Sequence, residues 1–211
     1  MTIRLHRGDL PDLSSPDLAA YASADAIAID TETLGLKPHR DRLCVVQLSP
    51  GDGSADVVQI AAGQTSAPNL ARLLGDRSKT KLFHFARFDV AVLHNALSID
   101  CAPVWCTKIA SRLVRTYTDR HGLKDLAREM IGVEISKQQQ SSDWAAETLS
   151  DAQLAYAASD VLYLHAIREQ LAARLARENR TAIAQACFEF LPTRALLDLA
   201  GWDDTDIFAH S

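Results

Sequence analysis

Three short strand-like runs between residues 26 and 60 constrain the fold of this chain more than any other feature. The runs cover residues 26–31, 42–49 and 55–60, and glycine and proline interrupt the chain at 35–38 and 50–53. Connections this short join neighbouring strands by hairpins. We therefore predict that the three strands are antiparallel neighbours in one sheet, after a short strand near 3–6 and a helix at 15–21.

From residue 68 onward the pattern changes to an alternation of helices and strands. We expect a helix at 69–74, a strand at 80–85, a helix at 87–97 and a short strand at 104–106, followed by helices. The clearest helix should run from 150 to about 177. Ser150 and Gln153 form a capping box at its start, and neither glycine nor proline occurs within this range. This order predicts an α/β fold with a mixed sheet flanked by helices.

The length of 211 residues favours one domain with an elaborated end over two complete domains, at about 150 residues a domain. We therefore expect residues 1–211 to form a single domain. The segment from about 188 to 211 is rich in large apolar residues, Trp202 and Phe208 among them. Because chain ends are usually polar, this segment should dock on its own core or on a neighbouring subunit.

Composition and charge exclude several classes of protein. Hydrophobic residues make up 47% and charged residues 23% of the chain, which excludes a disordered or collagen-like protein. The formal net charge of −5 argues against a protein that coats long nucleic acid by bulk electrostatics. Residues 101–140 nevertheless carry seven basic and four acidic side chains, and form either a solvated surface or a local site for an anion.

The four cysteines form no Cys-x-x-Cys pair and keep no zinc-finger spacing. A thiolate zinc site and a disulfide scaffold are therefore both disfavoured, and a reducing compartment is expected. No apolar run approaches the roughly 20 residues of a membrane span, and the first thirty residues lack a signal peptide's apolar stretch. These features predict a cytoplasmic protein that has no membrane partner.

The first candidates for chemistry are Asp30 and Glu32, at the end of the strand expected at 26–31. Side chains alternate along a strand, so both carboxylates project from one face and repel each other unless a cation lies between them. Acidic pairs at this spacing also arise by chance, about three times in a chain of this composition. Alone, the pair fits a metal site or an ordinary polar strand end.

Two further groups are equally ambiguous when each is considered alone. Asp89 follows a strand-to-helix junction, where carboxylates commonly cap helices, and His84 fits a core role or a ligand role. Tyr156 and Asp160 lie four residues apart on one expected helix, about 6 Å along its axis. They could address one water molecule or form an ordinary buried hydrogen bond.

Together, the four acids occur in the order and on the elements that a two-metal phosphodiesterase site needs. Such a site requires converging carboxylates that hold two divalent ions about 3.5–4 Å apart. Hard oxygen ligands favour Mg²⁺ or Mn²⁺, so we expect two such ions as cofactors. The expected metal ligands are Asp30, Glu32, Asp89 and Asp160.

The same residues lie in motifs that resemble a known family, the ribonuclease D branch of the DEDD exonucleases with a tyrosine in the third motif. The matching stretches are DTETLGL at 30–36, HFARFD at 84–89 and YAASD at 156–160. The stretch QSSDW at 140–144 is similar to the family's loop before the last catalytic helix. The resemblance covers nearly the whole chain.

The resemblance implies a ribonuclease H-like fold and 3′→5′ hydrolysis of RNA that releases nucleoside 5′-monophosphates. By matching positions, Asp30, Glu32 and Asp160 would hold the ion on the nucleophile side. Asp30 would bridge to the second ion, and Asp89 would reach that ion directly or through water. Tyr156 would orient the attacking water.

Further positions are implied as substrate contacts. The backbone at Thr33 and Leu34 would contact the terminal nucleotide, with an apolar side chain wedged between its last two bases. His84, in the second motif, is a further candidate. A short substrate of a chain with net charge −5 also needs a local pocket for its 5′ phosphate. We expect Lys137, Gln140 and Ser141 to supply it, with Lys137→Ala removing most of the preference for a 5′-phosphorylated dinucleotide.

The compact length, the stretch at 137–144 and the tail at 201–211 resemble the nanoRNase C subfamily more closely, oligoribonuclease-like enzymes that degrade dinucleotides. Ribonuclease D proteins that trim transfer RNA carry further helical domains, whereas about fifty residues follow Asp160 here. The subfamily implies short RNA as the partner and a homo-octameric ring whose subunits narrow access to the active site.

Three alternatives stay open. The chain could trim structured RNA ends such as transfer RNA precursors, and activity on DNA is also open. From another class, it could be a catalytically silent nucleic-acid-binding module, although all four acids and Tyr156 are present. A paired-carboxylate glycosidase fits less well, because acids two residues apart on one strand are poorly placed to flank a sugar bond.

Overall fold

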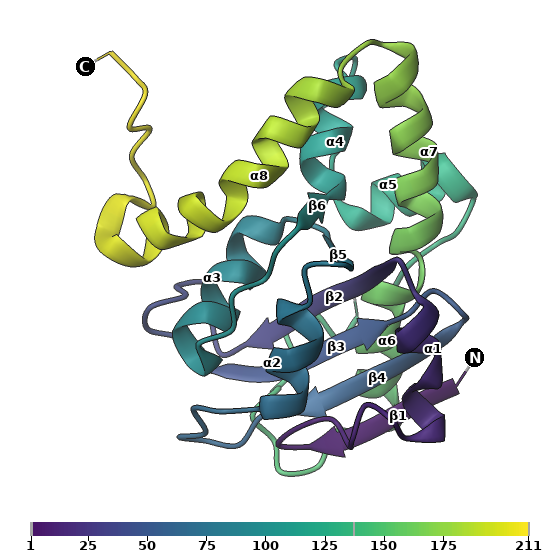
Figure 1. The fold of residues 1–211 in the computed structure, drawn as a ribbon, viewed down its shortest axis with the longest axis vertical. Coiled ribbons are helices and arrows are strands. Elements are labelled where there is room, and N and C mark those ends of the chain that lie inside the picture. The colour runs from purple at the N-terminus through teal and green to yellow at the C-terminus, as the bar shows by residue number, and fades with distance from the viewer. Residues whose placement is uncertain (1, 137, 211) are drawn as a thin grey trace.

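A mixed six-stranded β-sheet with helices on both faces forms the centre of the molecule (Figure 1). The computed structural model describes residues 2–136 and 138–210. The strands are β1 (Thr2–Arg7), β2 (Ala26–Thr33), β3 (Leu43–Ser49), β4 (Ser54–Gln59), β5 (Thr80–Phe83) and β6 (Val104–Cys106). Their order across the sheet is β1-β4-β3-β2-β5-β6, which confirms the predicted mixed α/β architecture.

The three strands predicted between residues 26 and 60 pair as expected. β2 is antiparallel to β3, and β3 is antiparallel to β4. Three parallel pairs complete the sheet, β2 with β5, β5 with β6, and β1 with β4 at the opposite edge. β2 is therefore a central strand. Its C-terminal end lies between β3 and the chain that leaves β5.

The helices form two layers on the sheet and a cluster beyond its β6 edge. They are α1 (Ala19–Ser23), α2 (Pro68–Gly75), α3 (Ala86–Leu97), α4 (Thr107–Val114), α5 (Leu123–Ile131), α6 (Asp151–Leu162), α7 (Leu164–Arg177) and α8 (Thr181–Leu197), with short turns at Pro16–Leu18 and Asp198–Trp202. Figure 1 shows α2 and α3 on one face of the sheet and α6 on the other. α4, α5, α7 and α8 pack against one another.

The single helix predicted from 150 to 177 is wrong in one respect, because the chain breaks it into α6 and α7 at Tyr163. The capping box of Ser150 and Gln153 is confirmed. At Tyr163 the backbone N–H donates to the carbonyl of Val161, which interrupts the helical pattern. α6 packs on the sheet, whereas α7 packs on α4 and α5. The helix therefore breaks at a position that no glycine or proline marks in the sequence.

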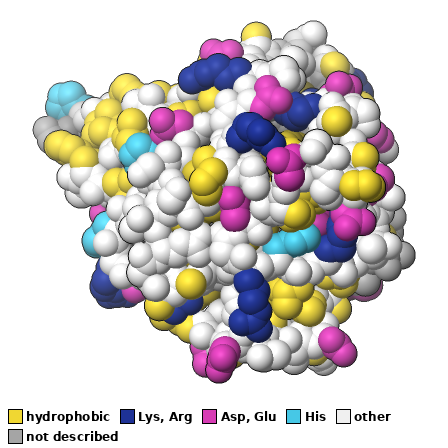
Figure 2. All heavy atoms as spheres, turned by 60° about the horizontal axis from the view of Figure 1, so that its bottom comes forward, with side chains coloured by type: hydrophobic (Ala, Val, Ile, Leu, Met, Phe, Trp, Pro, Cys, Tyr) yellow, Lys and Arg dark blue, Asp and Glu magenta, His cyan; other side chains and the backbone are white. Residues whose placement is uncertain are grey.

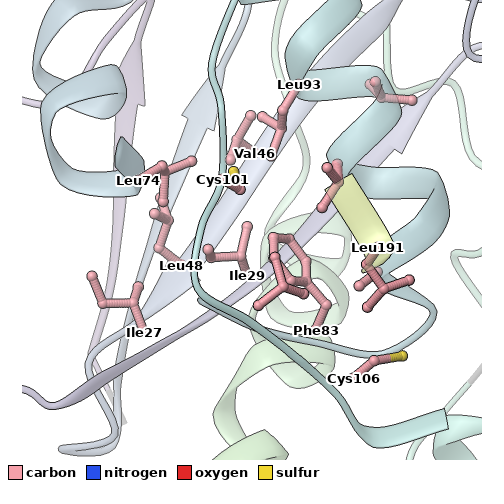
Figure 3. Close-up of a cluster of buried hydrophobic side chains, with 14 of the residues drawn as sticks. Ile27, Ile29, Val46, Leu48, Leu74, Phe83, Leu93, Cys101, Cys106 and Leu191 are labelled. Carbon is pink, nitrogen blue, oxygen red and sulfur yellow. The ribbon is translucent and has the colours of Figure 1, made fainter. Parts of the chain in front are cut away.

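The main core lies between the sheet and the layer of α2 and α3. Figure 3 shows Ile29 and Leu48 of the sheet beside Leu74 and Leu93 of the helices, and all four side chains are 3% exposed or less. Leu191 of α8 joins the same core, so α8 is an integral part of the domain. Burial of this apolar surface is the main stabilising contribution to the fold.

Apolar side chains become exposed after the middle of α8. Exposure is 51% for Leu196, 46% for Trp202 and 76% for Phe208, whose ring lies 5.8 Å from that of Phe190. Figure 1 shows the segment after α8 running away from the sheet. The C-terminal segment thus contacts the rest of the domain as far as Asp203, which pairs with Lys37, while its large apolar side chains from Trp202 onward stay exposed.

Charged side chains of both signs are interspersed on the face seen in Figure 2, in keeping with 22 basic and 27 acidic residues. A basic surface must therefore be local if the chain binds an anion. Among residues 2–136 and 138–210, no helix combines the length and the apolar character needed to cross a membrane.

Candidate active site

Three carboxylates converge near the C-terminal end of β2. Asp30 and Glu32 come from β2 and Asp160 from α6, and each offers an oxygen within 4.8 Å of the others. Side chains alternate on β2, so Ile29 faces the main core while Asp30 and Glu32 face the α6 layer. The three acids therefore meet because β2 packs against α6.

The fourth acid, Asp89, lies in the first turn of α3 and is 3% exposed. Its carboxylate accepts a hydrogen bond from Thr31 Oγ1 at 2.7 Å. Thr31 lies between Asp30 and Glu32 and points to the opposite face of β2. Asp89 is therefore separate from the group of three, but its negative charge contributes to raising the pKa of Asp30 and Glu32.

Asp89 is buried, and the three converging acids are half-buried. No cation among the described residues pairs with any of the four, and their pKa values shift upward. Burial is the largest cause in each case, and repulsion between the carboxylates adds to it for Asp30, Glu32 and Asp89. The pKa of Asp30 lies well above its usual range, that of Glu32 is raised to about 8, and those of Asp89 and Asp160 to about 7. Carboxylates that repel one another and have no cationic partner favour a divalent cation bound among their oxygens.

Two neighbouring polar side chains hold these carboxylates, and neither was predicted from the sequence. Thr31 binds Asp89, and Gln47 Nε2 donates to Asp30 Oδ2 at 2.8 Å. Gln47 lies directly opposite Asp30 on β3 and is fully buried. A glutamine inside the otherwise apolar run LCVVQL was the sequence signal for this role.

Tyr156 lies one turn before Asp160 on α6, and its hydroxyl interacts with the Asp160 carboxylate. Burial and the nearby carboxylates raise the pKa of Tyr156, so the phenol stays protonated at neutral pH. Its ring packs against buried Trp144 with the ring centroids 5.9 Å apart. The hydroxyl is thus held at the acids as a hydrogen-bond donor.

His84 is neutral, and its hydrogen bonds fix its tautomer. Its Nδ1 lies 2.8 Å from Thr107 Oγ1, and that hydroxyl donates to the carbonyl of Phe83 at 3.2 Å. Since the hydroxyl has one proton, Nδ1–H must donate to Thr107, which leaves Nε2 as an acceptor. Burial is the main cause that lowers the pKa of His84 to about 3.

A cavity of about 330 Å³ opens over the acids and is also lined by Lys108 and Lys124. Both lysines belong to the basic segment 101–140, so part of the positive charge of this segment faces the cavity. It is also partly structural, because buried Arg115 pairs with Glu129.

The predicted substrate contacts are distributed unevenly around this cavity. His84 and Gln140 line it, whereas Ser141 is absent from its lining. Leu34 is 54% exposed, and the Thr33 hydroxyl donates to the carbonyl of Gly35. Lys137 lies outside the described residues.

The chain also matches a family of known function. The model of the 3′-5′ exonuclease family matches residues 15–176. The chain belongs to this exonuclease family. Among curated relatives of the family, ribonuclease D of Acidiphilium cryptum is 36% identical over 159 residues, which are 75% of this chain and 40% of the relative. The chain thus spans about 40% of the length of that relative.

Two solved structures of exonuclease-family relatives extend the comparison over the whole chain. NrnC of Brucella melitensis with bound Mg²⁺ is 65% identical with a TM-score of 0.94, and covers 100% of both chains. NrnC bound to pGG is 66% identical with the same TM-score and coverage. The predicted relationship to the ribonuclease D-like exonucleases, and to the NrnC enzymes among them, is therefore confirmed.

A more distant structure confirms the predicted DEDD exonuclease fold. Escherichia coli RNase D is 24% identical with a TM-score of 0.77, over 92% of this chain and 51% of that chain. At this identity the similarity concerns the fold alone.

Proposed function

We propose that this chain is a metal-dependent 3′→5′ exoribonuclease that hydrolyses short oligoribonucleotides, above all dinucleotides, to nucleoside 5′-monophosphates. The observation that carries the proposal is the group of three half-buried, uncompensated acids in a cavity that also contains Lys108 and Lys124. Family membership and the similarity to NrnC bound to pGG support the same activity.

The donor set fits Mg²⁺ or Mn²⁺, because it consists of carboxylate oxygens with raised pKa values. We assign one ion to Asp30, Glu32 and Asp160, and a second to Asp30, which Asp89 would reach directly or through water. When bound, these ions supply Lewis-acid stabilisation of the phosphate and acidify a water molecule. NrnC of Brucella melitensis has been solved with bound Mg²⁺, which supports a divalent cation as the cofactor.

The remaining side chains bind and orient the reactants. Tyr156 donates a hydrogen bond to the attacking water, for which its protonated hydroxyl beside Asp160 is suited. The free Nε2 of His84 accepts a hydrogen bond from a sugar hydroxyl. Thr33 and Leu34 are assigned to the terminal nucleotide, since they directly follow Glu32 in the chain and Leu34 is apolar and 54% exposed.

The preference for short substrates follows from the size and charge of the cavity. A volume of about 330 Å³ suits a small ligand and not a folded RNA. Lys108, Lys124 and Gln140 are the described polar groups that could bind the 5′ phosphate, and Lys137 stays a prediction for the same role.

Ribonuclease D-like trimming of structured RNA is the second candidate, favoured by the sequence match to ribonuclease D of Acidiphilium cryptum. Activity on DNA, and binding without turnover, are outcomes that the same assays would reveal. A cytoplasmic location is part of the leading proposal, and four free thiols support it.

The activity is tested by timed product analysis with Mn²⁺ on pGG, unphosphorylated GpG and a transfer RNA precursor. We expect rapid conversion of pGG to GMP, slower cleavage of GpG and little trimming of the precursor. Dominant cleavage of the precursor would establish the second candidate instead.

The phosphate contact is tested by Lys108→Met, which should remove most of the difference between pGG and GpG. Arg72→Met is the control with the same loss of charge, because Arg72 is exposed on α2 and outside the cavity lining. An unchanged preference for pGG in Lys108→Met would remove Lys108 from the phosphate site.

We also propose a homo-octameric ring in which the exposed apolar C-terminal segment contacts a neighbouring subunit. Trp202, Ile207 and Phe208 are between 44% and 76% exposed, which is unfavourable for an isolated chain. Light scattering should give a mass near eight copies of 23.1 kDa, and truncation before Gly201 should lower it. A monomer of the full chain would contradict the ring.

A further inference from the structure

Phe85 has the backbone conformation that suits its side chain least. Its φ of 72° and ψ of 41° lie in the left-handed region, which bulky residues rarely adopt. The other two non-glycine residues with positive φ in the described chain are Ser98 and Asn179, which are small and polar. Phe85 is also 43% exposed, so burial of its ring in the core does not explain the conformation.

The ring of Phe85 lies at the junction of the acid cavity and two neighbouring cavities of about 230 and 290 Å³. The ammonium group of Lys108 lies 4.3 Å from the centroid of the ring, and Lys108 lines the acid cavity as well. An aromatic face beside a cation matches the two parts of a nucleotide, its base and its phosphate. Strained backbone is typically retained where it holds a side chain for function.

We propose that Phe85 is a specificity-determining residue whose ring stacks on the base of the nucleotide that carries the 5′ phosphate. This inference rests on the proposed function and adds a base contact to it. Lys108 covers one face of the ring and holds the phosphate, and the exposed part of the ring receives the base. Stacking reads no hydrogen-bonding pattern, so such a contact accepts any of the four bases.

The test compares pGG with an analogue that lacks the base of its 5′ nucleotide. The wild-type chain should cleave pGG with a kcat/KM about 5 to 150 times higher than the analogue, the usual range for one stacked base. Phe85→Leu keeps apolar bulk without an aromatic face and should remove most of this preference, whereas Phe85→Tyr should retain it. A preference retained in full by Phe85→Leu would overturn the proposal. A wild-type chain that leaves dinucleotides intact would refute the proposed function itself.

Stability provides a second readout that separates a functional ring from a structural one. Phe85→Asn introduces a residue that tolerates positive φ, so its Tm should equal the wild-type value or exceed it by about 2–4 °C, while kcat/KM on pGG falls. Ser98→Asn is the matched control, because Ser98 has the same backbone region at the far end of α3 and should leave the rate unchanged. A lower Tm in Phe85→Asn would assign the ring to packing and overturn the proposal.

Discussion

Two sets of carboxylates in this molecule are surrounded in opposite ways. Asp56 on β4 is fully buried, and burial alone would raise its pKa. Hydrogen bonds from Arg4, His6 and Tyr21, all between 2.7 and 2.8 Å, lower the pKa below its usual value instead. The acids around Asp30 are half-buried, but they receive hydrogen bonds from neutral groups only, and their pKa values rise.

The contrast shows how the same residue type serves structure in one place and chemistry in another. The charge of Asp56 is compensated by Arg4, and its hydrogen bonds connect β4 with β1 and α1. Both of its carboxylate oxygens are already occupied by donors from the chain. The group of Asp30, Glu32 and Asp160 lacks that compensation, which supports the proposal that it holds a cation from outside. The predictions below test this distinction.

Substitution of one acid should lower turnover in one group and stability in the other. Asp30→Asn should lower turnover by about 10³-fold or more, since it removes a metal ligand, and should leave metal-free stability unchanged or higher. Asp56→Asn should lower the free energy of unfolding by about 3 kcal/mol, since it leaves Arg4 without its partner, and spare the rate at saturating Mn²⁺. Urea unfolding and steady-state rates on pGG measure both effects.

The same result is expected for alanine in place of Glu32, Asp89 or Asp160. Near-native turnover of any of these variants at saturating metal would contradict its assignment as a ligand.

Each group also contains a tyrosine, and the pair sharpens the comparison. Tyr156→Phe should lower kcat by about 10²-fold and largely spare Mn²⁺ affinity, because the ring still packs on Trp144 while the hydroxyl is lost. Tyr21→Phe should spare kcat and lower stability by about 1–2 kcal/mol, because Asp56 loses one donor. Equal kcat for Tyr156→Phe and the wild-type chain would reduce Tyr156 to a packing residue.

Substitution of two glutamines on neighbouring strands distinguishes the positioning of Asp30 from a general effect of losing a buried hydrogen bond. Gln47→Leu should weaken Mn²⁺ binding about tenfold, because the Asp30 carboxylate loses the donor that orients it. Gln59→Leu also removes a hydrogen bond, to the carbonyl of Ala146, and should leave the affinity unchanged. Calorimetric titration with Mn²⁺ distinguishes them, and equal affinities would exclude the positioning role of Gln47.

The two groups should also respond to pH in different ranges. The folded-state pKa values of Glu32, Asp89 and Asp160 are raised to about 7 or 8, so metal-free stability is greatest below pH 4 to 5 for these groups and falls as pH rises to 8. The pKa of Asp56 is lowered, so its contribution persists above its unfolded pKa and is lost at lower pH.

Urea unfolding in EDTA should therefore show a decrease of about 1 kcal/mol or more between pH 5 and 8. Asp160→Asn should reduce this decrease, and Asp56→Asn should not. A pH-independent stability over this range would contradict the raised pKa values.

The four acids and Tyr156 were accessible from the sequence because their order and motifs resemble those of the exonuclease family, and local rules fix two pairs among them. Alternation on a strand places Asp30 and Glu32 on one face, and a helical turn places Tyr156 next to Asp160. The antiparallel hairpins were also predictable, since short connections leave few alternatives. These local rules account for the sheet between 26 and 60 and for two pairs, Asp30 with Glu32 and Tyr156 with Asp160, whereas the pairs meet only because β2 packs against α6.

Features that depend on tertiary partners were not accessible. Gln47 reaches Asp30 only through the register of β2 and β3, and Lys108 reaches the cavity only through the placement of α4. The break at Tyr163 arises because α6 and α7 pack on different partners, and no local residue marks it. The left-handed backbone of Phe85 likewise contradicts the preference of its residue type.

The central claim, that the uncompensated acids exist to hold divalent cations, is tested most directly by calorimetric titration of the metal-free chain with Mn²⁺ at pH 7. Measurements in buffers of different ionisation enthalpy count both the ions bound and the protons released. Because the pKa values of Glu32, Asp89 and Asp160 lie near or above 7, binding must displace protons. We expect two ions per chain with net proton release, both lost in Asp30→Asn and retained in Asp56→Asn. Absence of binding, or binding that survives in Asp30→Asn, would contradict the claim.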